Sequence, residues 1–205
     1  MVSELFYWVP VAYLLGSVPF GKLISKKVAH IDITSRGSRN IGATNVAREV
    51  GIKWGLLTLF LDILKGFIPV LLFAGYASQS ASFQEYGPTA VGLSALLGHQ
   101  FSLFLNFRGG KGVGTALGIY LALSPLGSLL AILLFILIVI KWNFISLGSL
   151  SAAAAMPVLL AIFGKPLPVI MGAVIAATVI CVKHVDNIHR LVRGEERKWR
   201  ESKSG

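Results

Sequence analysis

The chain has 205 residues, of which 55% are hydrophobic and 14% charged, and its mean hydropathy is +0.74. Ordinary globular chains carry about 25% charged residues, so this composition excludes a typical soluble domain and indicates an integral membrane protein. The formal net charge of +10 favours anionic lipid or phosphorylated substrates over nucleic acid as partners. The single cysteine, Cys181, excludes a disulfide framework and a cysteine-rich metal site.

Hydropathy predicts several membrane-spanning helices, each of which needs about 20 apolar residues. The candidates, in chain order, are Leu5–Ile24, Trp54–Gly75, Pro88–Phe107, Val113–Ile140, Phe144–Phe163 and Pro166–Val182. No basic residue precedes the first of them and no cleavage pattern follows it, so we expect a retained span and no signal peptide.

The run Val113–Ile140 decides the number of spans, because as one helix it would measure about 42 Å, which is long for one upright crossing. Pro125 lies near its middle, and proline disfavours helix directly before it. This favours a tight turn between two short spans. One long tilted helix, kinked at Pro125, is the alternative.

The basic residues set the expected orientation, because Lys and Arg concentrate on the cytoplasmic side of a membrane. Seventeen of the nineteen lie in 22–53, at 108 and 111, at 141 and in the tail from 183. The residues before Pro10 and the connection 76–87 contain neither Lys nor Arg. Only an odd number of spans satisfies this distribution, so we expect seven, with the N-terminus outside and the C-terminus in the cytoplasm.

The expected architecture is therefore one all-α, polytopic membrane domain over residues 1–205. Its cytoplasmic motif loops cover about 26–53 and 107–115, and its cytoplasmic tail covers 183–205. No repeat of fixed period is visible, and the connections are short for a separate soluble domain. Polar chemistry is thus expected in the cytoplasmic pieces.

The first of these, Asp32–Arg48, alternates glycines with hydroxyl, amide and arginine side chains. Glycine lets backbone N–H groups turn toward an anion, hydroxyls donate hydrogen bonds, and arginine forms bidentate bonds to phosphate. The segment is a candidate phosphate cradle. The alternative is a turn-rich surface loop whose arginines bind lipid headgroups.

The second, Phe107–Thr115, places glycines and Lys111 where one span ends and the next begins. A helix start presents N–H groups and a positive dipole end, and Lys111 adds a full charge. The P-loop spacing G-x-x-x-x-G-K-[ST] is absent, so ATP hydrolysis is not supported. The alternative is that the glycines only permit a sharp reversal of the chain.

The third, His184–Glu195, follows the last span. On a continuing helix His184 shares a face with Asn187, and Asn187 shares one with Arg190, which makes this face a candidate substrate contact. The alternative is an amphipathic tail lying on anionic lipid.

Polar residues inside the spans have structural and functional explanations. Asp62 and Lys65 are three residues apart, which favours a structural ion pair over a proton relay. His99, next to Gln100, either makes a hydrogen bond that helps the helices pack or lines a site. Ser146 and Ser149 either bond to the backbone or reach substrate.

Six short strings, found in order along nearly the whole chain, closely resemble the bacterial acyl-phosphate:glycerol-3-phosphate acyltransferase (PlsY) family. The strings are GSVPFG at 16–21, NIGATN at 40–45, LDILKG at 61–66, GH at 98–99, FRGGKG at 107–112 and DNI at 186–188. Several motifs in a consistent order are far more specific than any single glycine loop.

The resemblance implies a seven-helix enzyme of the bacterial cytoplasmic (inner) membrane that acts early in phospholipid synthesis. It would move a fatty acyl group from acyl phosphate to the 1-hydroxyl of glycerol 3-phosphate, giving lysophosphatidic acid and phosphate. Its implied partners are these two substrates and membrane lipid, with no metal and no cofactor. A monomer is compatible with the sequence.

The resemblance also implies the site residues, carried over position by position. The catalytic candidates are Ser38, Arg48, Lys111, His184 and Asn187. The substrate-binding and phosphate-binding candidates are Asn40, Gly42, Thr44, Asn45, Gly109, Gly110, Gly112 and Ser149. Arg39 departs from the family, which usually has glycine there, and this puts the turn around Ser38 in question. The base is either His184 or a substrate phosphate oxygen.

No His is followed five residues later by Asp, so the H-x-x-x-x-D pattern of thioester-using glycerolipid acyltransferases is absent, and a different acyl donor is expected.

Two other classes of function, a transporter and a lipid-binding scaffold, compete with the acyltransferase. An organic-phosphate transporter also needs cationic groups, but transporters tend to carry inverted repeats and midplane sites. A lipid-binding scaffold explains the basic tail but not the glycines at 109–112.

Overall fold

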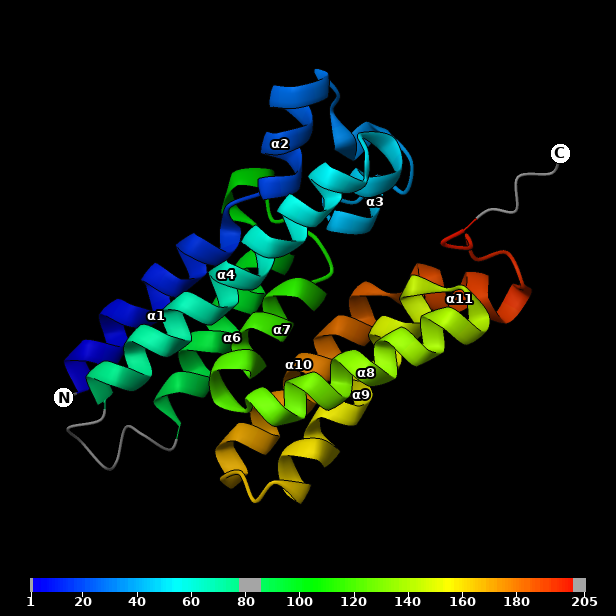
Figure 1. The fold of residues 1–205 in the computed structure, drawn as a ribbon. Helices are drawn as coiled ribbons and strands as arrows, with labels where there is room; N and C mark the ends of the chain where they lie inside the picture. Colours follow the sequence, from blue (N-terminus) through cyan, green and yellow to red (C-terminus); the bar gives the residue numbers. More distant parts are fainter. Residues whose placement is uncertain (1, 78–85, 201–205) are drawn as a thin grey trace, which may run out of the picture. The chain divides into compact units, whose positions relative to one another are not determined.

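The computed structural model describes residues 2–77 and 86–200, and these residues contain helices and no β-strand (Figure 1). The chain forms two compact units, which we call unit 1 (Met1–Leu123) and unit 2 (Ser124–Gly205). Most of the expected outward connection, residues 78–85, lies outside the described residues.

Unit 1 is built on four apolar helices that lie side by side. Its elements are α1 (Val2–Ser17), α2 (Phe20–Ala29), the 3₁₀ helix η1 (Ile33–Ser35), α3 (Ala43–Glu49), α4 (Ile52–Ala77), α6 (Gly87–Gln100), the 3₁₀ helix η2 (Leu103–Leu105) and α7 (Val113–Leu123). Helix α1 packs on α6, and α4 packs on α6 and α7. A Cβ at Gly16 would collide with the Ala95 carbonyl, and one at Gly98 with that of Tyr13. Small residues thus let α1 and α6 approach closely, as in other membrane helix pairs.

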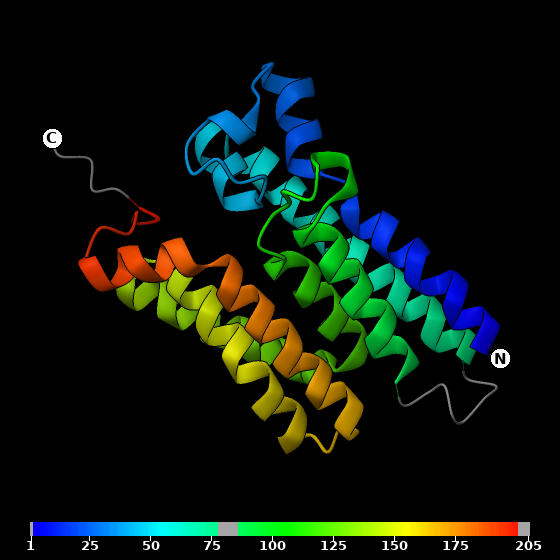
Figure 2. The same ribbon diagram turned by 180° about the vertical axis from the view of Figure 1, so that it is seen from behind.

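The short elements of unit 1 gather at one end of this bundle. There α1 and α6 end, α4 and α7 begin, and α2 and α3 lie beside them (Figures 1 and 2). Buried Ile33, Ile41 and Val46 form a small core beneath the first motif segment. The fold therefore brings both motif loops of unit 1 to the same end of the bundle.

Unit 2 consists of α8 (Pro125–Trp142), α9 (Ile145–Ile162), α10 (Leu167–Lys183) and α11 (Val185–Arg193). Helix α9 packs against both α8 and α10, and α11 contacts α9 and α10. The corner between α8 and α9, the start of α11 and the tail up to residue 200 lie at the same end of this unit (Figure 2).

Three described helices, α4, α8 and α9, are long and apolar enough to cross a membrane, and α10 with α11, bent by 63°, makes a fourth candidate. Helix α7 is apolar but has 11 residues. Large apolar side chains are widely exposed on these helices, for example Ile140 at 76% and Ile162 at 70%. These features fit a multi-pass membrane protein, whose apolar surface faces lipid.

The break expected near Pro125 is confirmed. Helix α7 ends at Leu123, Ser124 has the non-helical angles φ −154° and ψ 80°, and Pro125 opens α8. Proline suits a first helical position because its missing N–H has no helical partner there. One long kinked helix, the alternative, is therefore wrong.

Four expectations about helices differ from the structure. The third span does not run to Phe107, because α6 ends at Gln100 and the 3₁₀ helix η2 follows it. The first span does not run to Ile24, because α1 ends at Ser17 and Pro19, which lacks an N–H, separates it from α2. The first motif segment is not a loop throughout, since it contains α3. The third motif does not continue the last span, because the chain bends by 63° at His184.

Candidate functional site

Asn45 organises the first motif loop. Its Oδ1 accepts a hydrogen bond from the Ser38 N–H at 3.0 Å, and its Nδ2 donates to the carbonyls of Arg36 at 3.1 Å and Asn40 at 2.9 Å. The residue is 3% exposed. Because both ends of the carboxamide are engaged within the loop, Asn45, which the sequence predicts as a substrate ligand, shapes the loop that carries the other candidates.

The loop turns through two residues in the left-handed region, Gly37 at φ 55° and Arg39 at φ 57°. The Arg39 N–H donates to the Arg36 carbonyl at 2.8 Å, which closes the turn. Glycine adopts this conformation without steric cost, whereas a side chain costs about 1 kcal/mol or more. The structure thus keeps the turn despite Arg39, whose side chain is exposed.

The remaining candidates of this loop lie around the start of α3. Asn40 Oδ1 accepts from the Gly42 N–H at 2.9 Å, and Gly42 is the residue before the helix. Ser38 is exposed, while Thr44 and Arg48 are partly buried and lie four residues apart on α3, so they share a face. The loop therefore brings hydroxyl, amide and cationic groups together.

The second motif loop is fastened to the end of α6. The N–H groups of Gly109 and Gly110 donate to the carbonyls of Gln100 at 3.2 Å and His99 at 3.0 Å. Gln100 Nε2 donates to the Lys111 carbonyl at 2.9 Å. These bonds engage two N–H groups that the sequence offers to a phosphate, so the glycines here also serve a packed reversal of the chain.

Close packing requires glycine at these positions. A Cβ at Gly109 would collide with the His99 carbonyl, and a Cβ at Gly110 would collide with the His99 ring. Gly112 has φ 83°, in the left-handed region. The chain reversal places Lys111, partly buried, between α6 and α7.

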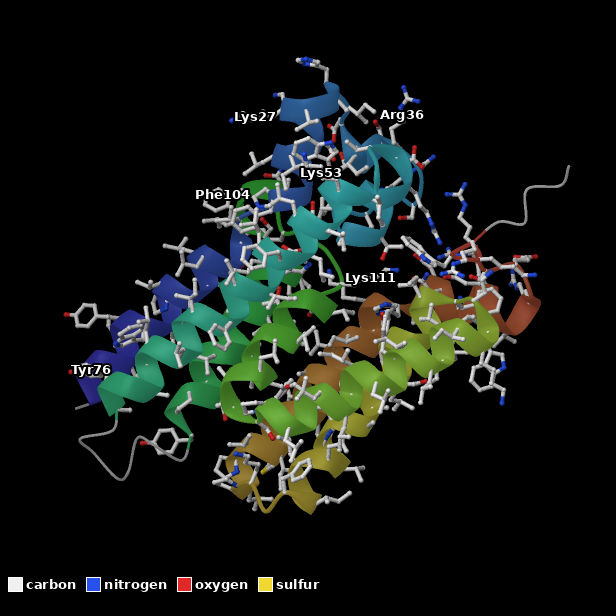
Figure 3. The ribbon with its side chains drawn as sticks, in the orientation of Figure 1. Lys27, Arg36, Lys53, Tyr76, Phe104 and Lys111 are labelled. Carbon is white, nitrogen blue, oxygen red and sulfur yellow. The ribbon has the colours of Figure 1, made fainter. Side chains whose placement is uncertain are left out.

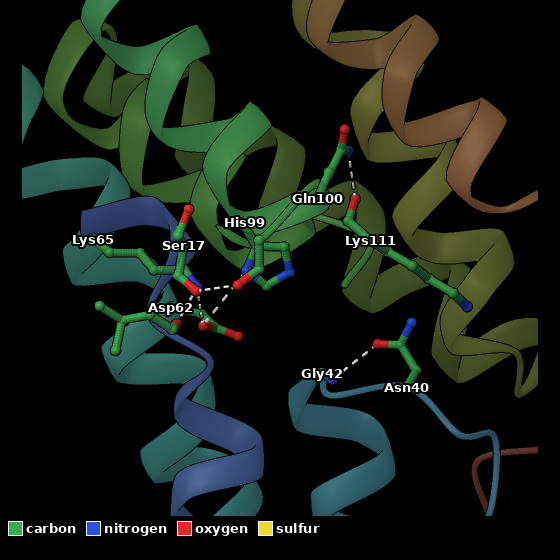
Figure 4. A network of polar contacts seen from close by, with 10 residues as sticks. Ser17, Asn40, Gly42, Asp62, Lys65, His99, Gln100 and Lys111 are labelled. Carbon is green, nitrogen blue, oxygen red and sulfur yellow. Dashed lines mark hydrogen bonds and ion pairs between the residues drawn. The ribbon is translucent and has the colours of Figure 1, made fainter. Parts of the chain in front are cut away.

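Lys111 lies in the second loop (Figure 3), and its side chain extends toward the turn of Asn40 and Gly42 in the first (Figure 4). Unit 1 therefore presents an ammonium group to a loop rich in hydroxyl and amide donors. Such a set of donors binds phosphate oxygens.

Beneath this end of unit 1 lies a buried polar cluster (Figure 4). Lys65 Nζ is 2.9 Å from Asp62 Oδ1 and donates to the Val18 carbonyl at 3.1 Å. His99 Nδ1 lies 3.7 Å from the same Asp62 oxygen. None of Asp62, Lys65 and His99 is more than 5% exposed. The expected ion pair between Asp62 and Lys65 is confirmed.

Glu196 organises the polar end of unit 2. Its Oε1 accepts from Ser146 Oγ and Asn187 Nδ2, each at 2.7 Å, and its Oε2 accepts from Arg190 Nε at 2.8 Å. Burial raises the pKa of this carboxyl, but hydrogen bonds from Asn187, Ser146 and Arg190 outweigh burial and hold the pKa below its usual range. The expected shared face of Asn187 and Arg190 is confirmed by this common acceptor.

Glu196 is missing from the residues that the sequence predicts. The sequence carries no signal that singles it out, because the tail from 183 holds four acidic residues, Asp186, Glu195, Glu196 and Glu201, among seven Lys and Arg. A second missed residue is Asn143, which accepts from the N–H groups of Trp199 at 2.8 Å and Arg200 at 2.9 Å and donates to the Arg200 carbonyl at 2.8 Å. The tail is thus bonded to the corner between α8 and α9.

His184 is 2% exposed at the bend between α10 and α11. Its Nδ1 lies 2.8 Å from the Ile180 carbonyl, which can only accept, so Nδ1 carries the hydrogen of this bond. In the neutral ring Nε2 is then the basic nitrogen. Asn187, at 7% exposure, follows one turn later, and Ser149, at 4%, lies one turn after Ser146 on α9.

The described residues include no group of three or more His, Cys, Asp or Glu side chains placed to hold a metal ion. What unites the candidates is their position at the ends of apolar helices within each unit. Fold and site together define a helical integral membrane protein whose polar groups, including Lys111, suit an anionic substrate.

Comparison with known proteins places the chain in a family. Residues 6–194 match the model of the glycerol-3-phosphate acyltransferase family. The chain is 48% identical to the glycerol-3-phosphate acyltransferase of Geobacter sulfurreducens, over 98% of this chain and all of that protein. It is also 48% identical to that of Trichlorobacter lovleyi, over 95% and 97% of the two chains. The chain belongs to the glycerol-3-phosphate acyltransferase family, as its motifs predict.

Two solved structures have the same fold. Both are crystal structures of PlsY (YgiH), an integral membrane glycerol 3-phosphate acyltransferase, one in a glycerol 3-phosphate form and one in a lysophosphatidic acid form. Each is 39% identical and covers 95% of both chains, and the TM-scores are 0.88 and 0.87. The identification of the chain as an acyltransferase from its motifs is therefore confirmed.

Proposed function

We propose that this protein transfers a fatty acyl group from acyl phosphate to the 1-hydroxyl of glycerol 3-phosphate and releases lysophosphatidic acid and phosphate. Family membership and the similarity to PlsY in its glycerol 3-phosphate form support the acceptor. The observation that carries the proposal is Lys111 extending toward the amide-rich and hydroxyl-rich turn of the first loop. This arrangement suits the phosphate groups of both substrates.

An acyl phosphate is already activated, because phosphate is a good leaving group. Neither ATP nor a covalent acyl-enzyme is then needed, and the protein has to position two anions and stabilise developing charge. We assign these roles to Lys111 and Arg48, with Ser38, Asn40, Gly42 and Thr44 of the first loop and Gly112 of the second as further phosphate contacts.

The attacking hydroxyl must lose its proton. In unit 2, His184 and Asn187 are the proposed acid–base and orienting groups, and Ser149 is a proposed substrate contact. The proton passes either to Nε2 of His184 or to a phosphate oxygen of a substrate. His184→Gln separates the two routes, since an Nε2 base predicts a loss of about 100-fold or more in kcat and a substrate base predicts a much smaller loss.

For the whole chain we propose one membrane domain in the bacterial cytoplasmic membrane. The seven apolar helices α1, α4, α6, α7, α8, α9 and α10 would each cross once, with the N-terminus outside. The distribution of seventeen of nineteen basic residues supports this orientation.

The test is a donor comparison with purified protein in detergent and radiolabelled glycerol 3-phosphate. Acyl phosphate should give labelled lysophosphatidic acid, acyl-CoA and acyl carrier protein should not, and inorganic phosphate should inhibit by occupying the leaving-group site. Product formed without a sealed compartment also excludes transport as the main activity. Efficient turnover with acyl-CoA alone would overturn the donor assignment.

A further inference from the structure

The buried cluster of Asp62, Lys65 and His99 lies beside the break between α1 and α2, where helical hydrogen bonding is interrupted. Helix α1 ends at Ser17, and Pro19 has no N–H to donate to the carbonyls left behind. Lys65 Nζ donates to the Val18 carbonyl at 3.1 Å, and Ser102 Oγ donates to the Ser17 carbonyl at 2.5 Å. The break between α1 and α2 is thereby fixed to α4 and, through Ser102, to the start of η2, which follows α6.

The same cluster contacts the second motif loop. The His99 ring lies against Gly110, where a Cβ would collide with Nε2. Asp62 lies against Gly114, where an added Cβ would come within 3.2 Å of the Asp62 Cβ. The His99 carbonyl also accepts from the Gly110 N–H at 3.0 Å. The backbone on both sides of Lys111 therefore rests on side chains of the cluster.

Stability alone does not explain why an ion pair occupies this position. Removing two charges from water is costly, and replacing a buried pair by apolar residues of similar volume is often neutral or stabilising. A buried pair with defined geometry does, however, fix the relative position of the segments that it joins. Here those segments are the break that leads into α2, the middle of α4, the end of α6 and the start of α7.

We propose that Asp62, Lys65 and His99 are positioning residues for Lys111. The cluster holds the second motif loop in register with the segment that leads into the first, so that the ammonium group of Lys111 meets the substrate phosphate. This inference rests on the proposed role of Lys111 in the acyl transfer.

The test combines the apolar replacement Asp62→Leu/Lys65→Met with Lys111→Ala. The double replacement leaves no unpaired buried charge, so a purely structural pair predicts near-normal kcat/KM in the folded variant. A positioning role predicts that kcat/KM falls by about 100-fold, because a catalytic group displaced by about 1 Å has an effect of this size. In a Lys111→Ala background the same double replacement should lower kcat/KM by less than about a further threefold. The effects of residues that act through one group are not additive.

Two further variants keep the outcome clear. His99→Gln removes the ring that packs on Gly110, and it should show the same non-additivity with Lys111→Ala even if the double replacement does not fold. Ser94→Ala is the matched control, because Ser94 Oγ makes a partly buried bond to the Val9 carbonyl at 2.6 Å between α6 and α1, away from the loop. Ser94→Ala should keep kcat/KM within about twofold of the wild-type value, with a Tm similar to that of the cluster variants.

Hydrogen exchange gives a readout that does not depend on activity. The N–H groups of Gly109 and Gly110, bonded to the end of α6, should exchange faster in both cluster variants while the amides of α4 and α7 keep their protection. Normal exchange with normal kcat/KM in the folded variants would overturn the positioning role, as would a loss that is fully additive with Lys111→Ala. An inactive wild-type protein would instead overturn the proposed function.

Discussion

Lys111 is the residue on which the proposed chemistry depends most. If its ammonium group stabilises charge on a transferring phosphate, Lys111→Ala should cost about 2 to 4 kcal/mol of transition-state stabilisation, as losing one electrostatic donor does. Lys111→Arg should recover only part of this, because the planar guanidinium needs a different space. The measurement is kcat/KM in detergent.

The control for Lys111 is Lys26→Ala, which removes an exposed cation from α2. It lowers the net charge equally and should leave the rate unchanged, so a general electrostatic effect is separated from a local one. A near-normal rate for Lys111→Ala, with an unchanged Tm, would remove the second motif loop from the mechanism.

Arg39 is a residue whose backbone conformation suits a different side chain. At φ 57° a non-glycine residue is strained, so Arg39→Gly should raise the stability of the folded state by about 0.5 to 1 kcal/mol. Arg39→Ala retains the Cβ and should give no such gain. Thermal unfolding of the two variants checks this, and a lower Tm for the glycine variant than for the alanine variant would contradict it.

At this scale the sequence identifies the chemistry of side chains better than their partners. Hydroxyl, amide and glycine residues predict a loop able to bind anions. They do not reveal that the Asn45 carboxamide donates its hydrogen bonds to the carbonyls of Arg36 and Asn40 within the loop. Glu196 escapes prediction because its three donors come from α9 and α11, which the sequence alone does not bring together.

At the scale of elements, the Glu196 carboxylate joins the tail of unit 2 to α9 and α11. Glu196→Gln should lower the stability of the protein at neutral pH by about 1 to 3 kcal/mol, since hydrogen bonds to a charged acceptor contribute about that much. Because the folded state holds the pKa of Glu196 below its ordinary value of 4.5, this stabilisation is present above pH 4.5. It is lost as the pH falls through the lower pKa of the folded state.

The stability gap between the wild type and Glu196→Gln should therefore narrow as the medium is acidified below pH 4.5. Glu195→Gln is the matched control, because it makes the same chemical change at an exposed neighbouring position. It should shift the Tm little at any pH. A gap between wild type and Glu196→Gln that widens on acidification would contradict the assigned network.

The two proline breaks between helices, at Pro125 and at Pro19, differ in how well the sequence predicts them. Pro125 interrupts an uncharged run too long for one span, so length and proline together predict the break that the structure shows. Pro19 also breaks a run, but one of ordinary span length, so nothing in the hydropathy demands an interruption there. The carbonyls that it frees are bonded by Lys65 and Ser102, which lie far away in sequence.

At the scale of the whole molecule, charge and helix length carry different information. Three described helices are long and apolar enough to span a membrane without help. Helices as short as α7 and α6, with 11 and 14 residues, need neighbouring loops or local thinning of the bilayer to complete a crossing. The distribution of Lys and Arg therefore carries the argument for seven crossings.

The seven-span topology predicts on which side of the membrane each connection lies. In a Cys181→Ser background, single cysteines replacing Tyr86 and Lys165 should react with an impermeant maleimide added outside intact cells, because seven crossings put the connections before α6 and α10 outside. Cysteines replacing Arg36 and Arg193 should react only after the membrane is opened, because most of the positive charge surrounds these two positions. Arg193 and Lys165 flank α10 and α11, so labelling of both from the same side would show that α10 does not cross. Labelling of Tyr86 and Arg36 from the same side would remove the crossing of α4, and the total would become even.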